Sequence, residues 1–199
     1  MDFDLLKQVN SLWRRIYPFL ASQIAASYQK DFGSVLELGP FSGGISLELA
    51  EQYPELRITI ADTSLQVLEY FAAEIEAAGL SRGIEVRQTD LNFLDFNDSQ
   101  FDLVIFRGAF FFLDERGKIF WEIFRVLKED GIAFVGGGYG KDTPDEFIRE
   151  IADESRELND RLGRKRVTVE NLKEILRRSE MGGRCRIVEE GGLWVIIEK

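Results

Sequence analysis

One short segment combines an acidic residue with several glycines: Glu37-Leu38-Gly39-Pro40-Phe41-Ser42-Gly43-Gly44. It follows a β-prone run and precedes a helical pattern. Backbone N–H groups are free at the start of a helix, and glycines lack the Cβ atoms that keep a ligand away from the backbone. The segment therefore predicts a binding turn for a nucleotide-like ligand. The alternative is a tight glycine turn that binds nothing.

The residues of this turn argue against a dinucleotide ligand. A G-x-G-x-x-G fingerprint that begins at Gly39 needs a glycine at position 41, where the chain has Phe41. The carboxylate of Glu37 would repel two phosphates, whereas it is compatible with the cationic methionine portion of S-adenosylmethionine. The turn thus favours S-adenosylmethionine over NAD.

Histidine and cysteine usage limits the remaining chemistry. The chain has no histidine, which is the commonest general base and metal ligand, and its single cysteine is Cys185. An internal disulfide and a cysteine metal cluster are excluded. We also find no convincing Asp and Asn pair of the metal-dependent catechol type, so we expect no metal site.

The segments that must position this turn alternate between strand and helix patterns. Helical stretches separate the early strands, for example the one after Ser64, which Gly79 ends, and another runs from about Asp114 to Lys128. This alternation predicts a parallel sheet with helices on both faces. The expected strands cover residues 34–38, 57–61, 84–88, 101–106 and 131–136.

The C-terminal residues predict a different strand arrangement. Two apolar runs, 184–190 and 193–199, flank Gly191-Gly192, which is the signal of a hairpin with a two-residue loop. The expected fold class is therefore α/β, with a doubly wound seven-stranded sheet of five parallel strands plus a C-terminal antiparallel hairpin.

Two helical segments complete the expected single domain of 199 residues. Residues 1–30 form an N-terminal helical arm, which Pro18 interrupts. Residues 141–180 form a helical insertion before the last two strands, with Thr143 and Thr168 as predicted N-caps.

The order of these segments resembles the class I S-adenosylmethionine-dependent methyltransferases, over roughly residues 33–138 and the terminal hairpin. No single motif is specific, and their order and spacing carry the resemblance. One departure is Phe41, which stands in place of the family's usual middle glycine. The matching segments are VLELGPFSGG, ITIADTS, RQTDLNFLDF, FDLVIFRGAFFFLDE and LKEDGIAFVGGG.

The resemblance implies roles for individual residues in donor binding. Asp62 would accept hydrogen bonds from both ribose hydroxyls, Asp90 would receive the adenine amino group, and Leu91 would lie by the ring. Asp95 competes with Asp90 for the adenine role, and both Asp62 and Asp90 have alternatives as helix caps or turn formers. The predicted cofactor-binding residues are Glu37, Gly39, Pro40, Phe41, Ser42, Gly43, Asp62, Thr63, Asp90, Leu91 and Arg107.

The methyl acceptor site is expected, by analogy, between residues 107–113, residues 137–140 and the N-terminal arm around Arg14 and Arg15. The candidate catalytic residues are Arg107, Tyr139 and Tyr17. Arg107 could grip an acceptor carboxylate or phosphate, or form a structural salt bridge. The run Phe110-Phe111-Phe112 is compatible with an apolar or planar acceptor, although a helix-packing cluster is favoured.

The formal net charge of −10 argues against a broad nucleic-acid surface. The basic cluster Arg161, Arg164, Lys165 and Arg166 fits a solvated helix end better than an anion site. No run of about 18 uninterrupted apolar residues and no signal pattern occur, so a cytoplasmic location without membrane insertion is expected. A homodimer is compatible with the sequence.

The sequence therefore predicts S-adenosylmethionine-dependent methyl transfer to a small molecule, with S-adenosylhomocysteine as the product. Two alternatives stay open. One is an accessory or sensor protein that binds S-adenosylmethionine without catalysis, and the other is a nicotinamide-dependent oxidoreductase.

Overall fold

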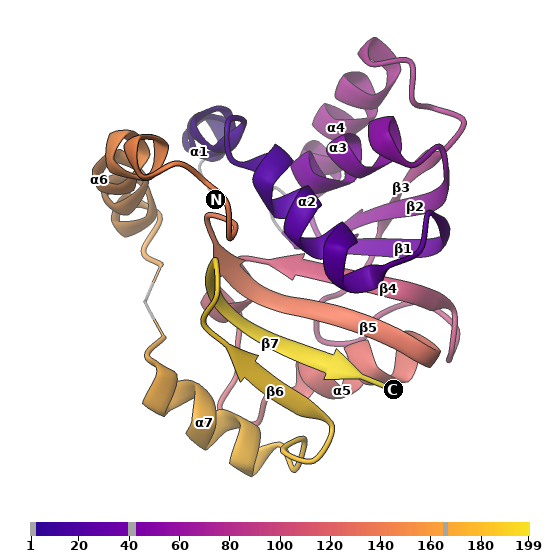
Figure 1. The fold of residues 1–199 in the computed structure, drawn as a ribbon, viewed down its shortest axis with the longest axis vertical. Helices are drawn as coiled ribbons and strands as arrows, with labels where there is room; N and C mark the ends of the chain where they lie inside the picture. The colour runs from indigo at the N-terminus through magenta and orange to yellow at the C-terminus, as the bar shows by residue number, and fades with distance from the viewer. Residues whose placement is uncertain (1–2, 40–42, 165–166) are drawn as a thin grey trace.

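A computed structural model describes residues 3–39, 43–164 and 167–199. Helices and strands alternate through the middle of the chain (Figure 1). The elements are α1 (Phe3–Trp13), α2 (Tyr17–Tyr28), β1 (Phe32–Leu38), α3 (Gly44–Gln52), β2 (Glu55–Asp62), α4 (Leu65–Ala77), β3 (Ile84–Gln88), β4 (Phe101–Arg107), the 3-10 helix η1 (Ala109–Phe111), α5 (Lys118–Val126), β5 (Leu127–Gly138), α6 (Asp145–Arg161), α7 (Val169–Arg178), β6 (Cys185–Val188) and β7 (Gly192–Glu198). Two successive helices, α1 and α2, come before the alternating part, and two more, α6 and α7, come after it and before the last two strands.

The strands form one seven-stranded sheet in the order β3-β2-β1-β4-β5-β7-β6. Strands β1 to β5 pair in parallel, and β7 pairs antiparallel with both β5 and β6. The predicted fold class is confirmed. The chain reverses its direction of winding between β1 and β4, where Glu37 lies opposite Ile105. In doubly wound sheets, ligands bind beyond the carboxyl ends of the strands at this position.

Each face of the sheet packs against its own hydrophobic core. Alternate strand residues such as Val35 and Ile105 face the core that helices α1 to α4 and α6 share. Their neighbours, such as Leu36 and Val104, face the core formed with α5 and α7. Strands buried on both faces in this way keep the carboxyl ends of β1, β2 and β4 in fixed positions relative to one another.

The N-terminal arm and the helical insertion meet at one end of the sheet. Helices α1 and α6 lie side by side there (Figure 1), and the indole Nε1 of Trp13 donates a hydrogen bond of 3.0 Å to Ser155 Oγ. Pro18 lies in the first turn of α2, where its missing N–H breaks no helical hydrogen bond. These contacts bring residues from the two ends of the chain to the same place.

Two of the predicted helix starts differ from the structure. Thr143 does not cap α6, because its hydroxyl donates to the Tyr139 carbonyl and the helix begins at Asp145 after an extended Pro144. Helix α5 begins at Lys118 rather than near Asp114, whose carboxylate accepts hydrogen bonds in the preceding turn. The predicted caps hold elsewhere, since Thr168 Oγ1 accepts from the Asn171 amide at 3.1 Å.

The C-terminal hairpin has a longer loop than predicted. Val188 pairs with Trp194, and Gly192 already pairs with Gly138 of β5, so the residues between the strands are Glu189, Glu190 and Gly191. The prediction of a two-residue loop at Gly191-Gly192 is therefore wrong. Pairing of β7 with the long strand β5 fixes the register, which the loop sequence alone does not determine.

Candidate functional site

Three strands bring charged residues to the same edge of the sheet. Glu37 is the penultimate residue of β1, while Asp62 and Arg107 are the last residues of β2 and β4. The carboxyl ends of parallel strands lie together, so the three side chains come from adjacent or nearly adjacent strands. Two cavities open beside them.

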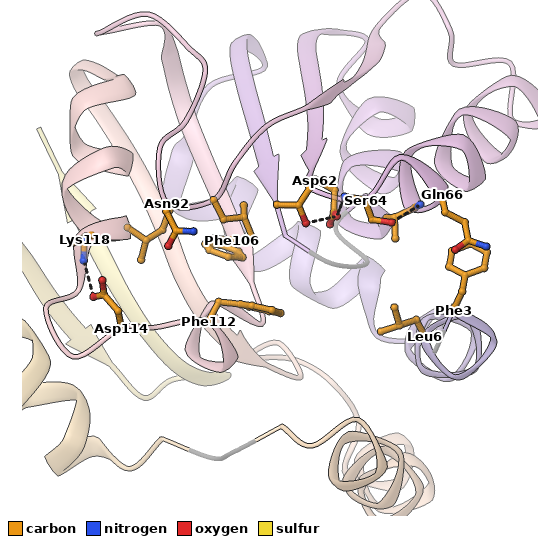
Figure 2. Close-up of a pocket in the computed structure, with 14 residues that line it drawn as sticks. Phe3, Leu6, Asp62, Ser64, Gln66, Asn92, Phe106, Phe112, Asp114 and Lys118 are labelled. Carbon is orange, nitrogen blue, oxygen red and sulfur yellow. Dashed lines mark hydrogen bonds between the residues drawn. The ribbon is translucent and has the colours of Figure 1, made fainter. Parts of the chain in front are cut away.

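The first cavity has a volume of about 240 Å³ and lies beyond β2 and β4 (Figure 2). Helix α1 contributes Phe3 and Leu6 at one side, while Phe112 and Lys118 lie at the other. The residues that line it are Phe3, Leu6, Asp62, Thr63, Ser64, Gln66, Val67, Leu91, Asn92, Phe106, Phe112, Asp114, Lys118 and Ile119.

The carboxylate of Asp62 is the most unusual group in the first cavity. The residue is 2% exposed, and its Oδ1 accepts hydrogen bonds from the Ser64 amide at 2.8 Å and Thr63 Oγ1 at 3.5 Å. Its Oδ2 is buried and has no hydrogen-bond partner among the described residues. Burial raises the pKa of Asp62, although the hydrogen bonds from Ser64 and Thr63 oppose the shift. An unsatisfied buried acceptor costs about 1–3 kcal/mol, so a ligand that donates to Oδ2 would be favoured.

Glu37 stabilises the turn between β1 and α3 and lines neither cavity. It is 1% exposed, and its Oε2 accepts a hydrogen bond of 2.8 Å from the Ser46 amide in the first turn of α3. Burial raises the pKa of Glu37, opposed by hydrogen bonds from Ser46 and Gly43 and by the positive charge of Arg107. A carboxylate at the start of a helix satisfies free N–H groups, so Glu37 fixes α3 relative to β1.

Gly39 shows why this turn requires glycine. Its φ is +97°, and a Cβ atom there would lie 2.2 Å from Cε2 of Phe106, which itself lines the first cavity. A side chain at position 39 would therefore push Phe106 into the cavity. The predicted ligand-binding residues Pro40, Phe41 and Ser42 lie outside the described residues.

The segment after β3 contributes Leu91 and Asn92 to the first cavity, but not Asp90. Asp90 is exposed, and its Oδ1 accepts hydrogen bonds from the amide and the side-chain nitrogen of Asn92, at 2.8 and 3.0 Å. It therefore orients the side chain that follows it. The competing residue Asp95 pairs with Arg87 at 3.2 Å. Sequence reasoning missed Asn92, although an Asp two residues before an Asn is a signal for this turn.

The second cavity, of about 400 Å³, lies beyond β4 and β5 and under α1 and α6. Phe112 lines both cavities, so they are neighbours. The predicted acceptor loops 107–113 and 137–140 contribute to it. The lining residues are Val9, Trp13, Arg107, Gly108, Phe110, Phe111, Phe112, Gly136, Gly137, Gly138, Tyr139, Ala152, Ser155, Arg156, Asn159, Asp160, Arg164, Val167 and Leu193.

Arg107 contacts aromatic rings in the second cavity rather than a carboxylate. Its guanidinium carbon lies 3.8 Å from the ring centroid of Trp13, and its buried Nε has no hydrogen-bond partner among the described residues. Burial lowers the pKa of Arg107, although the nearby Tyr17 and Glu37 oppose the shift. The structural salt bridge that the sequence left open is not formed within the described part of the chain.

The two candidate catalytic tyrosines have different surroundings. Tyr17 is buried and its hydroxyl donates a hydrogen bond of 2.6 Å to Asn10 Oδ1, while burial raises its pKa to about 12. It lines neither cavity. Tyr139 lines the second cavity, and its ring stacks on Trp13 with the centroids 5.0 Å apart. Of the two, only Tyr139 lines a cavity.

The other residues predicted for the acceptor site also fall into two groups: some line the second cavity, and others line neither cavity. Phe110, Phe111 and Phe112 all line the second cavity, and Phe110 also packs against the core formed with α5 and α7. Arg14 and Arg15 instead form ion pairs, with Glu74 and Glu150 respectively, and line neither cavity. The N-terminal arm contributes Val9 and Trp13 in their place.

The described residues contain no group of three or more Cys, Asp or Glu side chains placed to hold a metal ion. No helix in this part of the chain is long and apolar enough to cross a membrane.

A doubly wound sheet that ends in an antiparallel β6–β7 pair, with a glycine turn after β1 and an acid at the end of β2, defines the Rossmann-like class I methyltransferases. The sequence profile described as "Methyltransferase domain" matches residues 36–135, and the chain belongs to this family of S-adenosylmethionine-dependent methyltransferases. The match does not support the nicotinamide-dependent oxidoreductase alternative.

A solved structure extends this likeness to nearly the whole chain. A Methanococcus maripaludis protein, provisionally assigned to the S-adenosyl-L-methionine-dependent methyltransferases, is 28% identical with a TM-score of 0.81, over 98% of this chain and 91% of that one.

Curated relatives match a shorter part. The ubiquinone/menaquinone biosynthesis C-methyltransferase of Desulfotalea psychrophila is 28% identical over 134 residues, 65% of this chain and 50% of the relative. The malonyl-[acyl-carrier protein] O-methyltransferase of Geobacter sulfurreducens is 33% identical over 113 residues, 54% of this chain and 40% of the relative. The chain thus spans half or less of these two relatives.

Proposed function

We propose that the protein transfers a methyl group from S-adenosylmethionine to a small-molecule acceptor, with the donor in the first cavity and the acceptor in the second. The observation that carries the proposal is the unpartnered Oδ2 of Asp62. It lies at the end of β2, beside the switch in strand order, where a ribose hydroxyl could supply the missing hydrogen-bond donor. The cited relatives are named as a C-methyltransferase of ubiquinone/menaquinone biosynthesis and a malonyl-[acyl-carrier protein] O-methyltransferase, and both names support this reaction class.

The residues of the first cavity fit an adenosine. Asp62 and Thr63 would hold the ribose, while Leu91 and Asn92, from the segment after β3, would lie along the adenine. Gly39 leaves room for Phe106 and keeps the backbone close to the ligand. The cavity volume of about 240 Å³ is slightly below the range of about 300–1,000 Å³ typical of ligand pockets.

S-adenosylmethionine held by Asp62, Thr63 and Leu91 would supply an activated methyl carbon, and the electron pair of the broken C–S bond would stay on its sulfur. The chain then has to align the acceptor and exclude water. Phe3 and Leu6 of α1 cover the first cavity, and Phe112 borders both. Arg107 and Tyr139 can touch an acceptor in the second cavity.

Titration calorimetry with S-adenosylhomocysteine tests the donor site, and a labelled-methyl assay tests the reaction. We expect one binding site per chain, and transfer of label from S-adenosylmethionine to a small molecule in a cell extract. Tight donor binding without labelled product would instead favour the accessory or sensor role. Absence of donor binding would contradict the proposal as a whole. The single-domain organisation, the cytoplasmic location and the homodimer stay predictions.

A further inference from the structure

Arg164 lies inside the second cavity, although the sequence places it in a basic cluster at a helix end. Its Nη1 donates a hydrogen bond of 2.8 Å to Asn159 Oδ1, and its guanidinium carbon is 4.9 Å from the ring centroid of Phe111. The prediction of a solvated helix end is wrong for this residue. It fits the exposed Arg161, and Lys165 and Arg166 lie outside the described residues.

The charges that line the second cavity do not balance. Its lining includes three arginines and one acid, Asp160. Arg156 forms an ion pair with Asp153 at 2.7 Å. In contrast, Arg107 and Arg164 form no ion pair among the described residues, although the buried carboxylate of Glu37 attracts Arg107 from outside the cavity lining. Burial and the positive charge of Arg107 lower the pKa of Arg164 to about 10, so the two guanidinium groups repel each other.

Hydrogen bonds and aromatic contacts nevertheless hold the two arginines in place. Asn159, which accepts from Arg164, donates from Nδ2 to the Ser155 carbonyl at 2.6 Å. Ser155 Oγ in turn accepts from Trp13, the ring on which Arg107 lies. Two like charges that line one partly enclosed cavity repel each other, and a bound anion would offset that repulsion.

We propose, on the basis of the proposed function, that the methyl acceptor carries a carboxylate or phosphate on an apolar body, and that Arg107 and Arg164 bind this anion. The apolar body would contact the faces of Phe110, Phe111 and Tyr139, which line the same cavity. Guanidinium groups suit both anions, because their N–H donors match paired oxygens.

The test is calorimetry on protein saturated with S-adenosylhomocysteine, with two pairs of aromatic probes. Cinnamate is compared with cinnamamide, and phenyl phosphate with phenol, so that each anion has a neutral counterpart. We expect at least one anion to bind about tenfold or more tightly than its counterpart. Which anion binds more tightly identifies the acceptor group. Equal affinities within both pairs would overturn the proposal.

Arg164→Met and Arg164→Gln should each reduce the preference for the anion about tenfold. The glutamine variant retains an amide that can hydrogen-bond to Asn159, so it remains informative if the methionine variant is unstable. The matched control is Arg161→Met, which removes the same charge from the exposed end of α6 and should leave the preference unchanged. An equal effect of Arg161→Met would mean that general electrostatic attraction explains the binding, and would also overturn the proposal.

The donor affinity separates failure of this inference from failure of the proposed function. Arg164→Met should bind S-adenosylhomocysteine as tightly as the unsubstituted protein. A loss of donor affinity equal to the loss of anion affinity would assign Arg164 to the donor instead. If the unsubstituted protein bound no S-adenosylhomocysteine, the proposed function itself would fail.

Discussion

Each of the two neighbouring cavities contains charged side chains that form no ion pair within the described residues, including a carboxylate in the first cavity and guanidinium groups in the second. The first contains a buried carboxylate oxygen without a donor, on Asp62, and the second contains the cations Arg107 and Arg164, which form no ion pair within the described residues. A protein ordinarily pairs such groups internally, because leaving them unpaired is costly. The difference therefore indicates two ligands of different chemistry: one that donates hydrogen bonds from hydroxyls and one that brings negative charge.

The cavities also differ in how they are assembled. The first joins the ends of β2 and β4 and the segments after β2, β3 and β4 to residues of α1, α4 and α5, and its polar residues lie mostly close to strand ends. The second joins α1, the exits of β4 and β5, and the end of α6. Substitutions in one cavity should consequently leave ligand binding in the other largely intact, because their lining residues overlap only at Phe112.

Gly39→Ala should have the largest effect and should act on the first cavity. The added Cβ meets the Phe106 ring at 2.2 Å in a backbone conformation with φ +97°. Backbone strain and overpacking together should lower the free energy of unfolding by about 2–5 kcal/mol. S-adenosylhomocysteine binding should weaken as Phe106 shifts. Urea unfolding and calorimetry measure both effects.

The matched control for Gly39 is Gly182→Ala. Gly182 is exposed, and a Cβ atom there would meet nothing within 4 Å. This variant should change the free energy of unfolding by no more than about 0.5 kcal/mol. Equal stabilities of the two variants would show that position 39 tolerates a side chain, contrary to the packing described above.

Asp62→Ala should weaken S-adenosylhomocysteine binding by about 1–3 kcal/mol, because the ribose hydroxyls would lose their acceptor. Binding of the anionic probes should stay the same, since Asp62 does not line the second cavity. Asp95→Ala removes an exposed carboxylate from the same region and serves as the control. Unchanged donor affinity in Asp62→Ala would make the ribose assignment wrong.

Tyr17→Phe should separate a structural tyrosine from the tyrosine of the second cavity. The lost hydroxyl leaves Asn10 Oδ1 without its 2.6 Å hydrogen bond, so the free energy of unfolding should fall by about 1 kcal/mol. The relative rate of methyl transfer should stay near that of the unsubstituted protein. Tyr139→Phe should instead lower the rate of methyl transfer and leave the free energy of unfolding nearly unchanged. A large loss of rate in Tyr17→Phe at unchanged stability would restore Tyr17 as a catalytic candidate.

The smallest expected effect is that of pH on stability and on donor affinity. As the pH rises, the contribution of Asp62 to stability should fall, whereas the affinity for S-adenosylhomocysteine should rise. The raised pKa of Asp62 means that its stabilising contribution to the unliganded fold is present at low pH and is lost as the pH rises through that pKa. Donor binding should change in the opposite direction, because ribose hydroxyls donate best to the ionised carboxylate. S-adenosylhomocysteine affinity should therefore fall as the pH is lowered through the raised pKa.

Asp62→Asn removes this titration and should flatten both profiles relative to the unsubstituted protein. Glu37→Gln is a useful contrast, because Glu37 also has a raised pKa but lines neither cavity. It should change only the stability profile. Parallel affinity profiles for Asp62→Asn and the unsubstituted protein would exclude Asp62 as the source of the pH effect.

The sequence predicted the first cavity better than the second for a physical reason. Asp62 is the last residue of β2 and Gly39 directly follows β1, so the strand pattern alone places them at the carboxyl edge of the sheet. Arg164 and Trp13 are separated by most of the chain, and they line the same cavity because α1 packs beside α6. Local pattern cannot predict such tertiary contacts, and for the same reason it made Arg164 a solvated helix end.

A crystal structure of the protein with S-adenosylhomocysteine and cinnamate would show whether each cavity binds its own ligand. We expect a ribose hydroxyl within hydrogen-bond distance of Asp62 Oδ2, with the thioether sulfur facing the second cavity. The carboxylate of cinnamate should lie between Arg107 and Arg164. A ribose that leaves Asp62 Oδ2 without a partner, or a nucleoside that occupies the second cavity instead, would contradict this assignment.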